Sequence, residues 1–439
     1  MDIWRITGGN RLEGSCSVQG SKNAALPIIA ASLICPAETE LQNVPRLSDV
    51  DSALRILRYL GCSAYQSGNS VFINSKDVSC STIPECLMLE MRSSVFFLGA
   101  LTARCGEVRL SLPGGCRLGK RPIDLHLNAL RQMGAEIEEN GGEIFCRAYA
   151  LKGCDIELSF PSVGATENIM LASCAADGRT VIHGAAREPE ISALSDYLIS
   201  LGAEITGAGT SCITVEGFTA REHTRFTVIP DRIAASTLIC CTASAGGDVE
   251  LKNTVPEHFS TVSDFLRRSG CDIIHTLDSV RIRSEGRLRS VAFISTEPYP
   301  GFPTDAQPVV MAALLKAEGT AYIRENIFEN RFRQASELVK LGADIEINGD
   351  LARITGKERL FGNSLEATDL RGGASMIVAA LGAEGKSLIY DRGHISRGYE
   401  APDVCLRSLG ADITREPLNN SLSASALSEL ISVSPNYRY

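Results

Sequence analysis

The chain has 439 residues, 44% of them hydrophobic and 22% charged, which is enough to bury the cores of two or three domains and excludes a disordered or fibrous protein. Its 43 basic and 52 acidic side chains leave a net charge of −9, so the overall charge does not favour binding to nucleic acid or to an anionic membrane. Because we find neither a signal-peptide pattern nor the roughly 18-residue apolar run of a membrane span, we expect a cytoplasmic protein.

One short phrase, Leu-Gly-Ala or a close variant of it, recurs six times along the chain. Its glycines are 68 to 73 residues apart and are Gly61, Gly134, Gly202, Gly270, Gly342 and Gly410. An apolar pattern with helical spacing precedes each glycine, and alternating residues follow most of them. Each glycine is therefore predicted to end a helix and to lead into a β-hairpin.

A shorter helix, rich in small residues, is predicted near the start of each unit, with a strand after it. In chain order these helices are expected at residues 23–33, 92–103, 166–176, 232–244, 307–316 and 374–383. Each unit then contains a helix, a strand, a second helix and two further strands. The alternative is a series of unrelated α/β segments whose helix ends are alike by chance.

The two ends of the chain indicate how the units combine. The sixth unit stops after one strand, near Arg415, whereas the Arg-Ile-Thr-Gly of residues 5–8 repeats that of residues 353–356. We therefore expect the N-terminal strands to complete the sixth unit. The predicted organisation is two domains of three units each, with a mobile tail: residues 22–229, residues 1–21 with 230–415, and residues 416–439.

Charged side chains gather at the predicted starts of the small-residue helices. The cations are Lys22, Arg92, Arg232 and Arg371, and the carboxylates are Asp231, Asp305 and Asp369. If the units pack about a common axis these starts converge, and helix N-termini attract anions. The pattern predicts an anionic ligand with a carboxylate base nearby. Taken singly, each Asp could instead be only an N-cap and each Arg only a surface charge.

A glycine-rich segment, residues 113–122, contains Cys116 together with Arg117, Lys120 and Arg121. Three glycines and three cations around one cysteine predict a lid with a reactive thiol. The fifteen cysteines are odd in number and scattered, which is typical of reduced thiols. Neither the cysteines nor the six histidines have the spacing of metal ligands, and no nucleotide-binding glycine motif stands in its required setting. We expect no metal and no cofactor.

Several segments in combination resemble the UDP-N-acetylglucosamine 1-carboxyvinyltransferase family of enolpyruvyl transferases. They are residues 21–27, 112–116, 121–126, 162–166, 186–190, 230–232, 302–305, 329–332 and 397–400. The likeness runs from residue 1 to about residue 415. It implies an α/β fold of two inverse, inside-out barrel-like α/β domains, each made of three βαβαββ units. It also implies transfer of enolpyruvate from phosphoenolpyruvate to the 3-hydroxyl of UDP-N-acetylglucosamine, with release of phosphate, as the first committed step of peptidoglycan synthesis.

The resemblance further implies roles for individual residues. Cys116 would donate a proton and form the covalent adduct with fosfomycin, Asp305 would be the base, and Lys22 and Arg397 would complete the catalytic set. The residues implied to bind phosphoenolpyruvate are Lys22, Asn23, Arg121, Arg331, Arg371 and Arg397. Those implied to bind UDP-N-acetylglucosamine are Arg92, Arg121, Pro122, Ile123, Asp124, Leu125, Ser162, Val163, Gly164, Asp305 and Ile327.

Two departures from the family pattern are Phe160, where some members have lysine, and Ala234, where some have glutamate. Two other functions stay open. One is the sister reaction on shikimate 3-phosphate, against which the Gly-Gly-Cys segment and residues 121–125 argue. The other is a catalytically silent paralogue that binds a nucleotide sugar or a partner protein, which would need a damaged site. We expect a monomer that binds small molecules, without nucleic acid or membrane partners.

Overall fold

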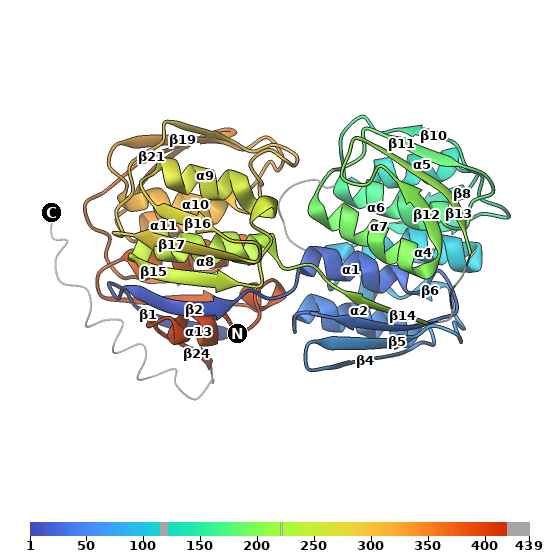
Figure 1. Cartoon of the computed structure of the whole chain (residues 1–439), viewed down its shortest axis with the longest axis horizontal. Helices are drawn as coiled ribbons and strands as arrows, with labels where there is room; N and C mark the ends of the chain where they lie inside the picture. Colours follow the sequence, from blue (N-terminus) through green and yellow to red (C-terminus); the bar gives the residue numbers. More distant parts are fainter. Residues whose placement is uncertain (115–121, 220, 222, 419–439) are drawn as a thin grey trace.

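The computed structural model describes residues 1–114, 122–219, 221 and 223–418. Its buried apolar side chains form two separate clusters. One cluster lies within residues 24–228, and the other joins residues 4–18 to residues 234–413. We call the bodies built around them the first lobe and the second lobe, and they lie side by side along the long axis of the molecule (Figure 1).

The first lobe contains three helix-strand-helix-hairpin units. Its elements are α1 (Lys22–Ala31), β3 (Glu38–Gln42), α2 (Ser48–Tyr59), β4 (Ser63–Ser67), β5 (Ser70–Asn74), β6 (Thr82–Ile83), α3 (Glu85–Met88), η1 (Arg92–Val95), α4 (Phe96–Cys105), β7 (Glu107–Ser111), α5 (Asp124–Gln132), β8 (Glu136–Asn140), β9 (Glu143–Arg147), β10 (Asp155–Glu157), α6 (Val163–Ser173), β11 (Thr180–His183), α7 (Pro189–Leu201), β12 (Ala203–Thr206), β13 (Cys212–Phe218) and β14 (His223–Thr227).

The second lobe repeats this order and also contains the N-terminal strands. Its elements are β1 (Asp2–Thr7), β2 (Leu12–Ser17), α8 (Arg232–Ala245), β15 (Gly247–Lys252), η2 (Pro256–Phe259), α9 (Ser260–Arg268), β16 (Asp272–His275), β17 (Ser279–Ser284), β18 (Phe293–Ser295), α10 (Gln307–Ala313), η3 (Leu314–Lys316), β19 (Thr320–Arg324), α11 (Ala335–Val339), β20 (Asp344–Asn348), β21 (Leu351–Thr355), β22 (Ser364–Glu366), α12 (Leu370–Gly382), β23 (Lys386–Asp391), η4 (Ile395–Arg397), α13 (Pro402–Ser408) and β24 (Asp412–Pro417).

The strands of the described residues form six four-stranded sheets with one shared pattern. In the sheet β6-β7-β9-β8, for example, the edge strand β6 is parallel to β7, and β7, β9 and β8 are antiparallel. The six repeat glycines have φ values between 91° and 113°, a region that favours glycine, where the second helix of each unit ends. The predicted helix ends are therefore confirmed.

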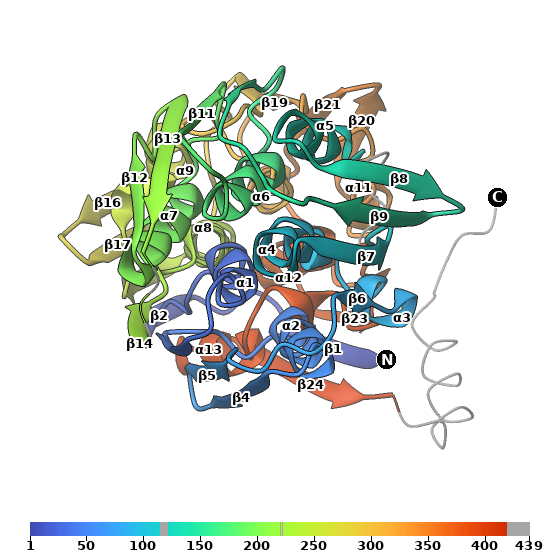
Figure 2. The same ribbon diagram turned by 90° about the vertical axis from the view of Figure 1, so that its right-hand side faces the viewer.

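The helices lie inside each lobe and the sheets lie outside. Seen from the end of the first lobe, α1, α4 and α6 occupy the centre, with the β4–β5, β8–β9 and β12–β13 hairpins at the periphery (Figure 2). Small residues let these helices approach closely: a Cβ built on Gly99 of α4 would lie 2.5 Å from the backbone oxygen of Asn168 in α6. Central helices and peripheral sheets are the inverse α/β arrangement, and the predicted fold class is confirmed.

The prediction for the N-terminal strands is correct for β1 and wrong for β2. Strand β1 lies between β23 and β24 and completes the sheet of the sixth unit. Strand β2 instead pairs in parallel with β15, in the sheet of the fourth unit. In the same way β14 pairs with β3 of the first unit and precedes α8 of the second lobe. Each edge strand therefore stays in the lobe that the chain is about to leave.

The chain passes between the lobes twice, at adjacent segments. Gly20 and Pro230 form an isolated antiparallel bridge, and Ser21 N–H donates to the Ile229 carbonyl at 2.7 Å. The predicted domain boundaries, 22–229 and 1–21 with 230–415, stay a prediction. Strand β24 continues to Pro417, so the start of the predicted tail at residue 416 is still paired with β1, and residues 419–439 lie outside the described residues.

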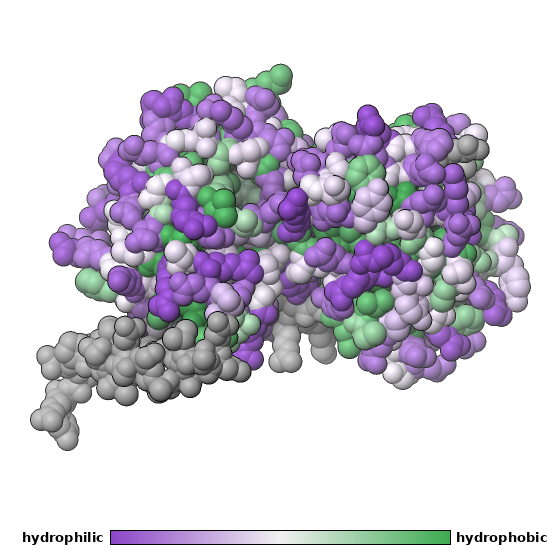
Figure 3. Space-filling view, turned by 90° about the horizontal axis from the view of Figure 1, so that it is seen from below, coloured by the Kyte–Doolittle hydropathy of each residue, from purple (hydrophilic) through white to green (hydrophobic). Residues whose placement is uncertain are grey.

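Membrane-spanning helices and metal-binding clusters are both absent from the described residues. None of the helices there is long and apolar enough to cross a membrane. No group of three or more His, Cys, Asp or Glu side chains in the described ranges is arranged to hold a metal ion. In the view from below, hydrophilic side chains cover much of both lobes, and a notch separates the two (Figure 3).

Candidate active site

The three aspartates at the helix starts differ in whether they cap the helix. Asp231 accepts hydrogen bonds from the N–H groups of Ile233 and Ala234, so it caps α8. Asp369 caps α12 in the same way. Asp305 is different because it lies just before α10, where no side chain caps the helix. The N-cap interpretation is therefore right for Asp231 and Asp369, and it fails for Asp305.

Asp305 is held by two buried arginines of the second lobe. Its Oδ1 accepts from Nη2 of Arg331 at 2.7 Å, and its Oδ2 accepts from Nη2 of Arg371 at 3.2 Å. The arginine side chains are only 2% and 4% exposed, whereas that of Asp305 is 29% exposed. A carboxylate that reaches solvent between two buried cations is a group that a ligand can contact.

The charges around Asp305 decide its protonation. Burial acts to raise its pKa, but the charges of Arg371, Arg331, Lys22 and Arg232 outweigh that effect and hold the pKa well below the usual range. Arg371 also stacks on the ring of Tyr399, with 5.4 Å between its Cζ and the ring centroid. Asp305 is therefore ionised in the unliganded protein.

A second cationic group joins the two lobes. Asp49, near the start of α2, accepts from Lys22 Nζ at 3.2 Å and from Arg397 Nε at 2.8 Å. Lys22 begins α1 in the first lobe, and Arg397 ends η4 in the second lobe. The Asp49 side chain is 5% exposed. The structure thus brings Lys22 and Arg397 together, as the resemblance implies, and adds a carboxylate between them.

The two groups act on one another electrostatically. Burial lowers the pKa of Lys22, and the charges of Arg371 and Arg397 lower it further against the opposing effect of Asp49 and Asp305. Burial would raise the pKa of Asp49, but Lys22 and Arg397 outweigh it, so this carboxylate is ionised. Cations from both lobes therefore share one field, which suits an anion with several negative charges.

Residues implied to bind the nucleotide sugar surround the starts of α5 and α6. Residues 122–125 lead into α5, and Ser162 caps α6 by accepting from Ala165 N–H at 3.3 Å. The helices are joined through His126, whose Nδ1 lies 2.9 Å from Asn168 Nδ2. Arg92 donates to the Pro113 carbonyl at 3.3 Å. The structure brings this first-lobe set together.

On the second lobe, Ile327 lies close in structure to the segment that contains Asp305. The Glu325 carboxylate accepts from Thr304 Oγ1 at 3.0 Å and from Ile327 N–H at 2.9 Å. Asn23 follows Lys22 in the first turn of α1 and is partly exposed. Cys116 and Arg121 lie outside the described residues, so their predicted roles stay predictions.

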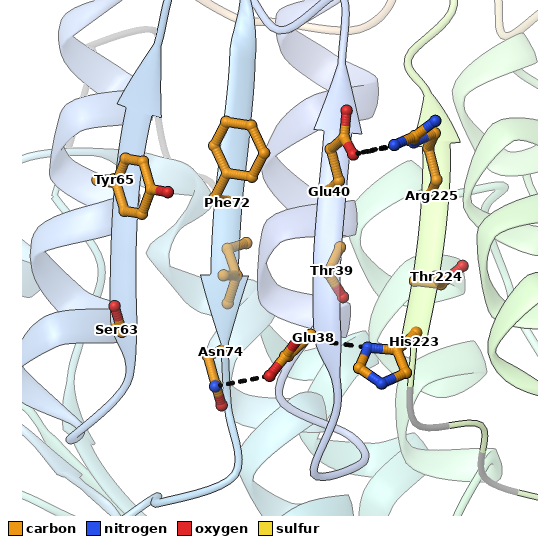
Figure 4. A pocket seen from close by; sticks show the side chains of 11 residues that line it. Glu38, Thr39, Glu40, Ser63, Tyr65, Phe72, Asn74, His223, Thr224 and Arg225 are labelled. Atoms are coloured by element: carbon orange, nitrogen blue, oxygen red, sulfur yellow. Dashed lines mark hydrogen bonds and ion pairs between the residues drawn. The ribbon is translucent and has the colours of Figure 1, made fainter.

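Two hollows in the described surface lie away from these charges. One, of about 510 Å³, is on the outer face of the β14-β3-β5-β4 sheet and is lined by the Glu38–His223 and Glu40–Arg225 pairs (Figure 4). The other, of about 570 Å³, lies beside the start of α6, between Pro161 and Arg187 of the first lobe and residues 297–301 of the second. Neither is lined by Asp305 or Lys22.

Sequence reasoning missed Asp49 and the pair that Arg232 makes with Glu190. Arg232 Nε lies 3.0 Å from Glu190 Oε1, across the two lobes, and both side chains are at most 10% exposed. No local signal marks Asp49, which is one of two acidic residues in the first turn of α2. Of the two departures, Phe160 is exposed and offers no cation beside α6, and Ala234 is buried in α8.

Comparison with known proteins gives consistent matches over nearly the whole chain. The family model described as EPSP synthase (3-phosphoshikimate 1-carboxyvinyltransferase) matches residues 6–402. A UDP-N-acetylglucosamine 1-carboxyvinyltransferase 2 of Caldanaerobacter subterraneus subsp. tengcongensis is 46% identical over 415 residues, which cover 94% of this chain and 100% of that protein. A UDP-N-acetylglucosamine 1-carboxyvinyltransferase of Myxococcus xanthus is 43% identical over 419 residues, covering 95% and 100%.

Solved structures resemble the chain in the same way. The enolpyruvyl transferase NikO of Streptomyces tendae is similar with a TM-score of 0.86 and 26% identity, covering 95% of this chain and 99% of that one. An EPSP synthase of Acinetobacter baumannii has a TM-score of 0.73 at 20% identity, covering 95% and 100%, which is a likeness of fold alone.

Proposed function

The chain belongs to the EPSP synthase family of enolpyruvyl transferases, and we propose that it transfers enolpyruvate from phosphoenolpyruvate to the 3-hydroxyl of UDP-N-acetylglucosamine. The observation that supports the site is the cluster of cations from both lobes: Arg331 and Arg371 bind Asp305, and Lys22, whose charge also acts on Asp305, is joined to Arg397 through Asp49. The acceptor substrate is taken from the names of relatives 43% to 46% identical over their whole length.

The reaction is an addition followed by an elimination. The 3-hydroxyl loses its proton and its oxygen bonds to C2 of phosphoenolpyruvate, while C3 gains a proton and becomes a methyl group. The intermediate then loses phosphate from C2 and a proton from C3, which restores the double bond. Each stage needs a proton donor and a proton acceptor near adjacent atoms.

Phosphoenolpyruvate has a phosphate and a carboxylate, and the cations of the site match both. Lys22 and Arg397 bind it with Asn23 and Arg121, and Arg331 and Arg371 add their field from beside Asp305. Because the cations are already in place when phosphate begins to leave, they stabilise the charge that develops in the transition state.

Asp305 accepts the proton of the sugar hydroxyl. Its lowered pKa makes it a weak base in the unliganded protein. Bound phosphoenolpyruvate brings negative charge to the same arginines, which weakens their effect on Asp305 and raises its pKa towards that of a working base. Cys116 donates the proton to C3 from the opposite side, and it is the residue that fosfomycin alkylates.

The nucleotide sugar binds along the first lobe and reaches the second. Residues 122–125 and Ser162 to Gly164 hold the nucleotide through the starts of α5 and α6, where unpaired N–H groups favour phosphate. Arg92 and Arg121 add cations, and Phe160 leaves one fewer diphosphate contact than a lysine would provide. Asp305 and Ile327 meet the sugar from the second lobe.

This activity is the first committed step of peptidoglycan synthesis. Both substrates are small soluble anions, and we place the enzyme in the cytoplasm as a monomer that needs no metal, cofactor, nucleic acid or membrane. The domain division at residues 22–229 and 1–21 with 230–415 makes the cleft a joint between two bodies, which close when ligand bridges them.

The test is phosphate release from phosphoenolpyruvate by purified protein, with UDP-N-acetylglucosamine and with shikimate 3-phosphate in parallel. We expect release with the nucleotide sugar alone. The Cys116→Ala variant should lose release, while Cys86→Ala, at an exposed cysteine of α3, should keep it. Phosphate release with shikimate 3-phosphate would refute UDP-N-acetylglucosamine as the acceptor. No phosphate release with either acceptor would favour a catalytically silent paralogue.

A further inference from the structure

Asp49 is a buried carboxylate to which the reaction assigns no role, and it lies among the cations proposed to bind phosphoenolpyruvate. It belongs to α2 of the first lobe, and Arg397 belongs to η4 of the second. The α2 and η4 elements contact each other, and the Asp49–Arg397 bond of 2.8 Å crosses between the lobes. Asp49 lies in the first turn of the second helix of the first unit, and Arg397 lies just before the second helix of the sixth unit.

The geometry of the bridge leaves the ligand-facing donors free. Of the three guanidinium nitrogens of Arg397, only Nε donates a hydrogen bond to Asp49. The terminal Nη1 and Nη2 groups have no partner among the described residues. Lys22 Nζ likewise has Asp49 as its one partner in the described ranges and keeps further N–H donors. An arginine fixed at Nε presents its two terminal nitrogens as a fork, the form that binds phosphate or carboxylate in two places.

We propose that Asp49 is a positioning residue for phosphoenolpyruvate, which holds Lys22 and Arg397 at a fixed separation across the two lobes. This inference rests on the proposed function of the site. Without the bridge, Lys22 and Arg397 repel each other and each long side chain regains rotamer freedom, which has to be lost again when the ligand binds. Asp49 therefore favours binding although it has the same sign of charge as phosphoenolpyruvate.

Removing the Asp49 carboxylate has two opposing effects on the binding of phosphoenolpyruvate, so the direction in which the KM changes shows which effect dominates. Removing a negative charge beside the cations would by itself strengthen the attraction for an anion. Losing the bridge would weaken binding because an amide cannot accept strongly from both cations. If positioning dominates, the KM for phosphoenolpyruvate rises in the Asp49→Asn variant. If charge competition dominates, that KM falls.

The experiment measures steady-state phosphate release by Asp49→Asn, with each substrate varied in turn. We expect the KM for phosphoenolpyruvate to rise about 10- to 100-fold, the size of a lost hydrogen bond between charged groups, with a much smaller change in kcat. The KM for UDP-N-acetylglucosamine should stay within about twofold, since neither Asp49 nor its partners Lys22 and Arg397 are among the residues proposed to bind that substrate. The matched control is Asp51→Asn, an exposed carboxylate two residues further along the same helix, which should behave as the unaltered protein.

A calorimetric titration with phosphoenolpyruvate alone distinguishes a failure of the proposed function from a failure of the positioning role of Asp49. If the unaltered protein neither binds it nor releases phosphate, the proposed function fails. If the unaltered protein works and Asp49→Asn keeps or lowers its KM, only the positioning role is overturned. Should Asp49→Asn not fold, Asp49→Glu replaces it: moving the carboxylate by one methylene should raise the KM for phosphoenolpyruvate with the melting temperature retained, and an unchanged KM would refute the inference.

Discussion

His126 makes the stability of the first lobe depend on pH. This residue is 6% exposed, and its Nδ1 faces the amide nitrogen of Asn168 at 2.9 Å. The amide oxygen of Asn168 accepts from Gly99 N–H at 2.7 Å, so the amide donates to His126. The imidazole is therefore an acceptor at Nδ1 and neutral. Burial, with a smaller effect from Arg92, lowers its pKa from 6.5 to about 3.

The lowered pKa of His126 determines how the stability of the protein changes with pH. Unfolding frees His126 to take up a proton below pH 6.5, whereas the folded protein resists protonation until about pH 3. The contribution to stability is complete above pH 6.5 and is lost progressively as the pH falls below it. Between pH 7.5 and pH 5.0 the loss integrates to about 2 kcal/mol.

The perturbation is His126→Gln, which removes the titrating group and keeps a hydrogen-bond acceptor. Urea unfolding followed by circular dichroism gives the free energy of unfolding of each protein at pH 7.5 and pH 5.0. The variant should lose about 2 kcal/mol less than the unaltered protein over this interval. The control is His223→Gln on β14, whose side chain is 66% exposed and which should keep the full loss. An equal loss in His126→Gln and in the unaltered protein would refute the reasoning.

Three further changes test other parts of the structure. Asp305→Asn should lower kcat by about 10²- to 10⁴-fold, the range for loss of a general base, and phosphate release measures it; activity within tenfold would exclude that role. Asp369→Ala removes two N-cap hydrogen bonds of α12 and should cost about 1–2 kcal/mol in urea unfolding, so an unchanged midpoint would contradict the cap. Gly99→Ala places a Cβ 2.5 Å from the Asn168 carbonyl oxygen and should destabilise the α4–α6 contact by about 1–3 kcal/mol, measured by thermal melting against Gly217→Ala, where nothing lies within 4 Å.

Much of the repeat could be predicted because it depends on local properties. The six glycines end helices in a backbone region that favours glycine, and the apolar spacing before them is a property of short segments. Strand β2 could not be assigned in this way. Its own residues predict a strand, but the choice between the fourth and the sixth sheet depends on where the chain crosses between lobes.

The candidate site, too, could be predicted from the sequence only in part. The resemblance of short motifs identified Lys22, Asp305 and Arg397, and the structure brings their charges into one field. Asp49 has no motif of its own, and its partner Arg397 is 348 residues away. Such a pairing depends on the packing of α2 against η4, which no short segment encodes.

By itself, the sequence determined the six units, their helix ends and the chemical types of the side chains at the helix starts, because these follow from periodicity and backbone preference over a few residues. Only the tertiary structure decided which of those carboxylates are caps, which edge strand enters which sheet, and that Asp49 lies between two cations. Those outcomes depend on contacts between segments hundreds of residues apart, and such contacts form only when both lobes are packed.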